Sequence, residues 1–496
     1  MMRTTGFYRR RSAAVAVTAI FMVLLAFRLE LLSIPGGGTT VPGTEMTVSG
    51  TTARDTWMNI SQQGQKIGYA HRTFVRHEEG YRLREEVFMR VQTMGVVQGI
   101  ALHTEGVLDG RMNLTSFSFQ LRSNLFAFQA EGRVTGKRLV VVTRTGGDEQ
   151  RHELSLKEPV HLAQGLLSGD AAAKLAPGQE IAVAVFDPMT MGSRPVKILF
   201  SGEETRTVMG RPMVLRKYAV DFMGARQYAW LDREGEVVRE EGMLKMALEK
   251  TSRDEALAGL GSAAAADLTD LASIDAGAVI GDPAGLRMLA VEVEGITDRS
   301  LMLSGGRQHY GPGGLLTVRR ETPRPVDDGE RESPESHLGD TPFIQTHHPE
   351  IRARARAIVA DGGGRDEDKA RRILDWVYRN IAKRPVISVS NAVETLRNRA
   401  GDCTEHAVLT AALARAAGIP AQLETGVVYQ KGRFYYHAWN VFWLADWGGW
   451  VTADAVMNQL PADVTHLRLV RGEAERQLDL MGVVGRMKLK LKEMSP

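Results

Sequence analysis

The single cysteine of the 496-residue chain, Cys403, stands where a loop is expected to become a helix. A lone cysteine cannot form an internal disulfide, so its thiol serves either chemistry or packing. Asp402 and Glu405 match a capping box, and the apolar run that follows ends at the helix-stop residues Gly418 and Pro420. Cys403 therefore belongs to the first helical turn, where backbone N–H groups and the helix dipole favour the reactive thiolate. This position predicts a catalytic nucleophile, with a buried structural thiol as the alternative.

A histidine and an aspartate further along could complete this chemistry. Residues 433–444 alternate like a strand that places His437 on one face, and a second short strand after the turn at 446–449 places Asp454 on an equivalent face. Two antiparallel neighbours would bring Asp454 beside His437. A carboxylate that fixes one histidine tautomer lets the ring take a proton from a thiol, which is the logic of a nucleophile, base and orienter triad.

The segments around these residues carry a resemblance to a known family. They are residues 401–407, 415–421, 436–439 and 450–454. In composition and order they resemble the core of the transglutaminase-like superfamily, over about residues 342–471. The resemblance implies an α+β, papain-like fold in which the cysteine opens a helix that packs on an antiparallel sheet carrying the histidine and the aspartate.

Residue by residue, the resemblance makes Cys403 the nucleophile, His437 the base and Asp454 the orienting carboxylate. Members of the family commonly carry proline after the aspartate, whereas Ala455 follows here. That change should loosen the turn and leave the carboxylate in place.

A zinc site is the competing interpretation of the same segment. Cys403 and His406 have a C-x-x-H spacing that puts both on one helix face, and His347, His348 or His437 could complete the shell. No second cysteine and no further paired-ligand motif supports a metal. We therefore expect no metal and no other cofactor, and we interpret His406 as a packing residue.

The N-terminus predicts where the chemistry happens. Three arginines, 9–11, precede sixteen uncharged residues, 12–27. This stretch is short against the roughly 20 residues that span hydrocarbon, but neighbouring apolar residues and snorkelling charges can extend it. The arginines should stay cytoplasmic, which sends everything after Pro35 across the membrane. We expect an uncleaved anchor, with a cleaved signal peptide as the alternative, and a bulk that is extracytoplasmic, or periplasmic in a Gram-negative cell.

The remaining chain has the composition of a globular protein with about three domains, since 43% of its residues are hydrophobic. The net charge of +3 is too balanced to imply nucleic acid. Between turn signals, ranges such as 81–94, 126–134, 139–143 and 213–222 alternate like strands of a large antiparallel sheet. The expected plan is a basic stub and anchor helix at 1–34, a tether at 35–55, an antiparallel β domain at 56–250, a linker with a small β segment at 251–340, a transglutaminase-like catalytic domain at 341–475, and a basic tail or edge strand at 476–496.

The expected function is that of a membrane-tethered cysteine enzyme that acts on amide bonds of a peptide or protein substrate through a thioester. Hydrolysis is the first choice because nothing in the sequence specifies an amine acceptor. Crosslinking acyl transfer to an amine is the second. A non-catalytic binding module that keeps the fold is the third, and a broken triad would indicate it.

Overall fold

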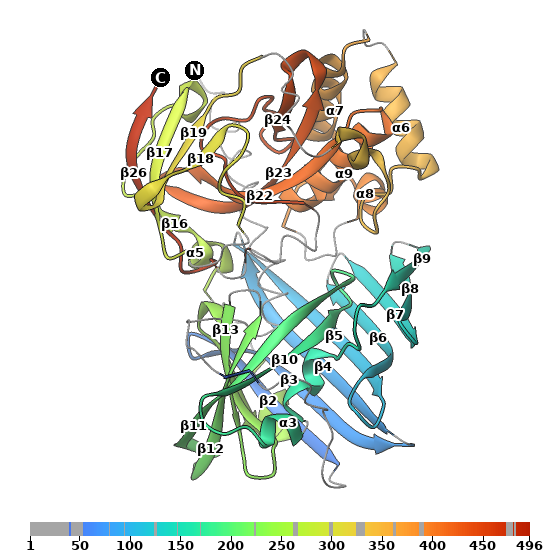
Figure 1. The fold of residues 1–496 in the computed structure, drawn as a ribbon, viewed down its shortest axis with the longest axis vertical. Helices are drawn as coiled ribbons and strands as arrows, with labels where there is room; N and C mark the ends of the chain where they lie inside the picture. The colour runs from blue at the N-terminus through green and yellow to red at the C-terminus, as the bar shows by residue number, and fades with distance from the viewer. Residues whose placement is uncertain are drawn as a thin grey trace. The chain divides into compact units, whose positions relative to one another are not determined.

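The computed structural model describes residues 39–40 and 53–496 apart from short gaps. The gaps are residues 79, 94, 124–125, 146, 169, 223–224, 261–265, 297–300, 324–332, 361–363, 386–390, 473–479 and 481–482. The predicted membrane helix at 12–27 lies outside the described residues, and within them no helix combines the length and the apolar character needed to cross a membrane. The described chain forms two compact units, the first ending at Leu268 and the second running from Thr269 to Pro496 (Figure 1).

The first unit is built on one continuous sheet. Its order is β1-β10-β11-β12-β13-β14-β15-β2-β3-β4-β5-β6-β7-β8-β9, antiparallel throughout except where β1 meets β10. The elements are β1 (Thr39–Thr40), β2 (Arg54–Gln62), β3 (Gln65–His77), β4 (Gly80–Thr93), β5 (Val96–Leu108), β6 (Leu114–Ser123), β7 (Ala127–Thr135), β8 (Arg138–Thr145), β9 (Asp148–Ser155), α3 (Asp170–Ala173), β10 (Gln179–Asp187), β11 (Gly192–Val208), β12 (Arg211–Phe222), β13 (Ala225–Leu231), β14 (Val237–Glu241), β15 (Met246–Thr251) and α4 (Arg253–Leu257).

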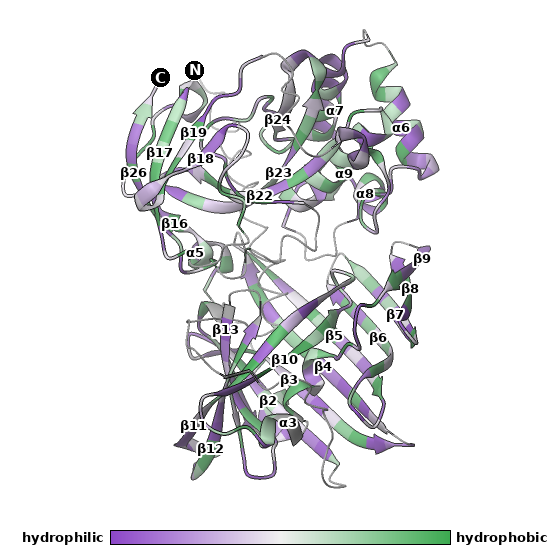
Figure 2. Ribbon diagram, viewed as in Figure 1, coloured by the Kyte–Doolittle hydropathy of each residue, from purple (hydrophilic) through white to green (hydrophobic). Residues whose placement is uncertain are grey.

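Alternation of polar and apolar residues explains why these segments are strands. In β4 and β5 nearly every second side chain is buried, so one face of the sheet forms a core and the other carries polar groups. Figure 2 shows the two classes alternating along the strands. Gly136, with φ of +60°, makes the tight turn between β7 and β8. The predicted large antiparallel β domain is thereby confirmed.

The second unit begins within α5 (Leu268–Ala272) and contains a mixed helix and sheet region. Its larger sheet has the order β16-β23-β22-β25, and β24 also pairs with β23. The strands are β16 (Ile274–Asp275), β22 (Ala421–Gln430), β23 (Arg433–Leu444), β24 (Gly449–Ala453) and β25 (Leu467–Arg471), and the helices are α6 (Pro349–Val359), α7 (Asp366–Asn380), α8 (Ala392–Asn398) and α9 (Cys403–Ala416). The helices gather at one side of this sheet (Figure 1) and share a core with β22 and β23.

Local signals in the sequence account for the helices. In α7 the buried residues Ala370, Ile373, Leu374 and Val377 recur at helical spacing. Asn391 caps α8, because its side chain accepts a hydrogen bond of 3.1 Å from the backbone N–H of Glu394.

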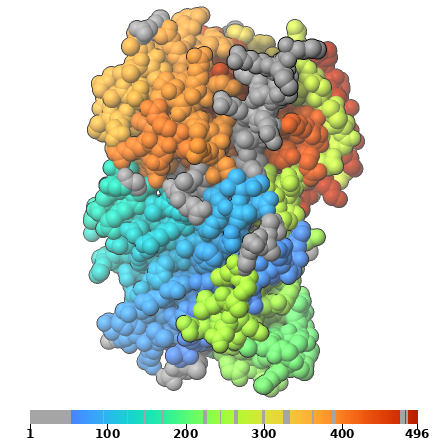
Figure 3. Space-filling view, turned by 180° about the vertical axis from the view of Figure 1, so that it is seen from behind, coloured from blue at the N-terminus to red at the C-terminus, as the bar shows by residue number. Residues whose placement is uncertain are grey.

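A second, smaller sheet joins distant parts of the chain. Its order is β18-β19-β17-β26, formed by β17 (Met288–Glu294), β18 (Gln308–Tyr310), β19 (Leu315–Arg319) and β26 (Lys488–Ser495). β26 lies at the edge and pairs antiparallel with β17, and Figure 3 shows the two segments, in red and yellow-green, side by side at the surface. A short parallel pair, β20 (Ala382–Lys383) and β21 (Ala400–Gly401), precedes α9. The predicted domain boundaries themselves stay predictions.

Candidate active site

Cys403 is the first residue of α9, as the capping signals predicted. The Asp402 side chain accepts a hydrogen bond of 2.7 Å from the Thr404 N–H, and the Glu405 side chain accepts one of 3.0 Å from the Asp402 N–H. Gly401 permits this box, because a Cβ there would lie 2.3 Å from the Cβ of Glu405. Burial and the neighbouring Glu405 carboxylate raise the pKa of Asp402 well above its usual range, which limits the negative charge beside the thiol.

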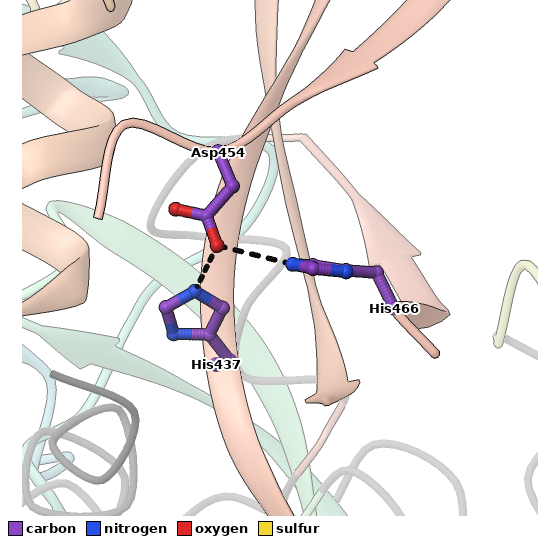
Figure 4. Close-up of side chains that lie close together, drawn as sticks. All are labelled: His437, Asp454 and His466. Atoms are coloured by element: carbon purple, nitrogen blue, oxygen red, sulfur yellow. Dashed lines mark hydrogen bonds and ion pairs between the residues drawn. The ribbon is translucent and has the colours of Figure 1, made fainter. Parts of the chain in front are cut away.

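His437 lies in β23 and its imidazole uses its two nitrogens differently. Nε2–H donates to Oδ2 of Asp454 over 2.8 Å (Figure 4). Nδ1 is buried and meets no oxygen or nitrogen partner among the described residues. Burial lowers the pKa of His437, but the Asp454 carboxylate and a hydrogen bond and charge interaction with Cys403 raise it by more, to about 9. The nitrogen that faces away from Asp454 is therefore free to exchange a proton with the thiol.

The body of α9 packs on the other set of alternating residues of β23. Asn440 donates its side-chain N–H to the Ala407 carbonyl over 2.9 Å, and Ala438 and Phe442 belong to the core shared with the helix. His437 belongs to the alternate set of β23 residues. The interaction that links it to Cys403 and raises its pKa involves the first residue of α9.

Asp454 follows directly after β24 and is fixed at every polar atom. Its Oδ1 accepts hydrogen bonds of 2.6 and 3.1 Å from the backbone N–H groups of Val456 and Met457, and its own N–H and C=O pair with Gln459. Burial raises the pKa of Asp454, yet His437 and His466 lower it by more, so the net shift is strongly downward. The turn is held by these bonds, with Ala455 in the position where proline is common.

His466 is a member of the site that the sequence analysis missed. Its Nε2 lies 3.0 Å from Oδ2 of Asp454, the same oxygen that His437 contacts (Figure 4), and its side chain is fully buried. His466 lies in the loop before β25, where no helical or strand periodicity predicts that its side chain would face Asp454. Its position twelve residues after Asp454 was the one available signal.

Trp439 packs against both histidines. Its ring is stacked on His437 at 6.0 Å between centroids and meets His466 edge-on at 5.2 Å. Its Nε1–H donates to the buried carboxylate of Glu424 over 2.8 Å. Burial raises the pKa of Glu424, but the guanidinium groups of Arg471 and Arg468 bring it down to about 2. This buried ionic group fixes the indole that flanks the two imidazoles.

Residues 302–321, which lie within the predicted linker with a small β segment at 251–340, hold the loop that carries His466. The Gln308 side chain accepts from the Arg468 N–H at 2.9 Å and donates to the Arg468 carbonyl at 2.7 Å, as a neighbouring strand would. Arg307 donates to the His466 carbonyl over 3.1 Å, and its partner Glu321 accepts from the Thr452 N–H over 2.9 Å. The small sheet therefore supports the backbone on both sides of the site.

The zinc alternative finds no geometry to support it among the described residues. His406 directs Nδ1 to the Asp402 carbonyl at 2.5 Å, and His348 caps α6. The one cluster of potential ligand atoms there is His437, Asp454 and His466, whose atoms lie within 4.8 Å of one another. Hydrogen bonds to one shared carboxylate oxygen account for that closeness.

Part of the chain matches a known protein family. The family model of the transglutaminase-like superfamily matches residues 352–455, a range that contains α7, α8, α9, β22, β23, β24 and Asp454. The comparison with curated proteins found no match.

Three solved structures are similar to parts of the chain. A β-barrel-like protein of a domain of unknown function from Brucella abortus is 12% identical, covers 40% of this chain and 96% of its own, and has a TM-score of 0.31. A presumptive cysteine protease from Cytophaga hutchinsonii is 16% identical, with coverage of 42% and 86% and a TM-score of 0.26. A presumptive protease from Parabacteroides distasonis is 11% identical, with coverage of 71% and 68% and a TM-score of 0.18.

These identities and TM-scores are too low to carry an argument about activity. The range matched by the family model is more informative, because it includes the elements that carry the buried residues Cys403, His437 and Asp454. Residues 352–455 form a domain of the transglutaminase-like superfamily.

Proposed function

We propose that the protein is a cysteine-dependent amide hydrolase that cleaves peptide or peptide-like bonds through a thioester. The observation that carries the proposal is the buried chain of contacts from Cys403 through His437 to Asp454. A thiol at a helix start, a histidine with one ring nitrogen toward it, and a carboxylate that fixes the other nitrogen are the parts of covalent acyl transfer.

In this proposal Nδ1 of His437 takes the Cys403 proton and Sγ attacks the carbonyl carbon of the scissile amide. Collapse of the tetrahedral intermediate breaks the C–N bond, and the leaving amine takes the proton from Nδ1. Water then gives a proton to the same nitrogen while its oxygen attacks the carbonyl carbon of the thioester. The C–S bond breaks and Sγ takes the proton back from Nδ1, which yields a carboxylic acid and the free thiol. Asp454 accepts the Nε2–H bond throughout and stabilises the imidazolium. The side chains of all three residues are buried, so a substrate must displace neighbouring groups to reach Sγ.

The products of a mixed peptide library distinguish the candidate activities. Purified full-length protein, incubated with the library and a labelled primary amine, is expected to generate new peptide N-termini without incorporating the amine, as read by mass spectrometry. Release of ammonia with incorporation of the label would replace hydrolysis by crosslinking transfer. Absence of both products would favour the binding module.

We also propose that the protein acts outside the cytoplasm on a single N-terminal anchor, on the basis of the basic and apolar pattern of residues 9–27. A reporter that is active only outside the cytoplasm, fused after Gly43, should be active, and the protein should remain in membranes washed with carbonate. An inactive reporter would contradict the export. Recovery of a soluble protein that lacks its first thirty or so residues would replace the anchor by a cleaved signal.

A further inference from the structure

Both ring nitrogens of His466 face groups that accept hydrogen bonds. Nε2 lies 3.0 Å from Oδ2 of Asp454. Nδ1 lies 3.2 Å from the carbonyl oxygen of Asp463 and 3.3 Å from its Oδ1. A neutral imidazole has one N–H, so it would turn a lone pair toward an oxygen at one end.

Neither aspartate can supply the missing proton. The two oxygens of Asp454 accept from His437, Val456 and Met457 in addition to His466. Asp463 is similarly committed, because Oδ1 accepts from the N–H and hydroxyl of Thr465 and Oδ2 accepts from the Gln459 side chain at 3.0 Å. Carboxylates that receive this many donors are ionised.

We infer that His466 is a buried imidazolium held between two carboxylates, and that it is a positioning residue for the Cys403–His437 pair. The second part of this inference rests on the proposed function. Burial lowers the pKa of His466, whereas the charge of Asp463 and hydrogen bonds with both aspartates raise it to about 9. The ring therefore keeps both protons at neutral pH.

The other groups around His466 do not supply this charge. Trp439 meets the ring edge-on and is uncharged, and Arg307 contacts the backbone carbonyl of His466 while paired with Glu321. Beyond Trp439, the charge of Glu424 is matched by Arg468 and Arg471. His466 is thus the cation that contacts both Asp454 and Asp463.

This cation sets how strongly His437 holds its proton. The rings of His437 and His466 lie 5.9 Å apart between centroids, close enough for the two charges to repel in a buried site. Without His466, both carboxylates would act on His437 unopposed and its imidazolium would release a proton less readily to the leaving amine. His466 therefore limits how far the pKa of His437 is raised, so that the His437 imidazolium can still give up its proton. It also helps to orient Asp454.

The charge state can be measured without any catalytic assay. Full-length protein labelled with ¹⁵N-histidine is compared by NMR with the His466→Gln variant, which assigns the His466 signals. At pH 7 both ring nitrogens of His466 should be protonated. His161 is the matched control, because it is a buried histidine with a single acceptor, the Met112 carbonyl at 2.7 Å from Nδ1, and burial lowers its pKa. A His466 ring with one protonated nitrogen at pH 7 would overturn the inference.

The Asp463→Asn variant tests the same point if His466→Gln does not fold. It removes the charge at Nδ1 and leaves the backbone carbonyl in place. We expect the pKa of His466 to fall, so that its ring titrates below pH 9 in the same spectra. An unchanged His466 titration would contradict the two-carboxylate origin of its charge.

The positioning role is read from the alkylation of Cys403 by iodoacetamide as a function of pH. The rate should show a step where the His437 imidazolium loses its proton, and His466→Gln should move that step upward by about one to two pH units. His309→Gln, an exposed change on β18, should leave it in place. A slower reaction with an unmoved step would reduce His466 to a structural role. A Cys403 that resists alkylation in every variant would overturn the positioning role together with the proposed function, while NMR still decides the charge.

Discussion

Replacement of Cys403 by alanine is expected to lower kcat/KM for peptide hydrolysis by about 10⁵-fold or more, because it removes the atom that forms the thioester. The change deletes only Sγ at the first residue of α9. The capping bonds of Asp402 and Glu405 stay in place, so the melting temperature should change little. Initial rates on a cleavable peptide, with circular dichroism on the same samples, measure both quantities.

Thr410→Ser is the matched control for this variant. It removes one buried methyl group from the same helix, two turns beyond Cys403, and should retain nearly full activity. Hydrolysis that survives in Cys403→Ala and disappears on heating would place the reaction elsewhere in the chain. Full rescue of a deletion phenotype by Cys403→Ala would support the binding module instead.

Replacement of His437 by alanine should lower kcat/KM by about 10⁴-fold or more, and replacement of Asp454 by alanine by about 10²- to 10³-fold. The first change removes the group that carries the proton, whereas the second leaves that group and removes its orientation. Asp454→Ala also leaves the buried His466 facing one carboxylate in place of two, so it should lower the melting temperature more than His437→Ala does. Initial rates and melting curves of both variants test whether His437→Ala loses more activity and Asp454→Ala loses more thermal stability.

The pH profile supplies an independent check on the role of His437. Its imidazolium donates the proton to the leaving amine, so activity of the unmodified enzyme should fall as pH rises through about 9. Asp454→Ala removes the main attraction that holds this pKa up, and the alkaline limb should move to lower pH. A limb that stays at the same pH in Asp454→Ala, or a greater loss of activity than in His437→Ala, would contradict the assignment.

Short-range chemistry explains what could be predicted from the sequence. Asp402 and Glu405 specify the start of α9 within one turn, and that fixes the place of Cys403. Strand alternation then predicted that His437 and Asp454 would lie side by side, and His437 Nε2 lies 2.8 Å from Asp454 Oδ2. Each of these features depends on residues that are close in sequence or on a period of two.

The rest depends on partners that no local pattern reveals. His466 lies in a loop, where neither the helical nor the strand periodicity applies. Its role arises because the Asp454 carboxylate can accept hydrogen bonds from the rings of both His437 and His466. Gln308 pairs with the backbone of Arg468, 160 residues away, through its side chain. The same separation in sequence hid the contacts that residues 302–321 make with the site, although a small β segment was predicted within residues 251–340.

The pairing of β17 with β26 has a consequence for when the candidate site gains its full support during synthesis. The strand that starts near residue 288 cannot gain this neighbour until residues 488–495 have been synthesised. β17 also pairs with β19, which leads to Glu321, and Glu321 holds the backbone next to Asp454. A nascent chain therefore carries its thiol for about 90 residues of further synthesis before the supporting sheet can close, so the backbone around Asp454 gains this support only after residues 488–495 have been made.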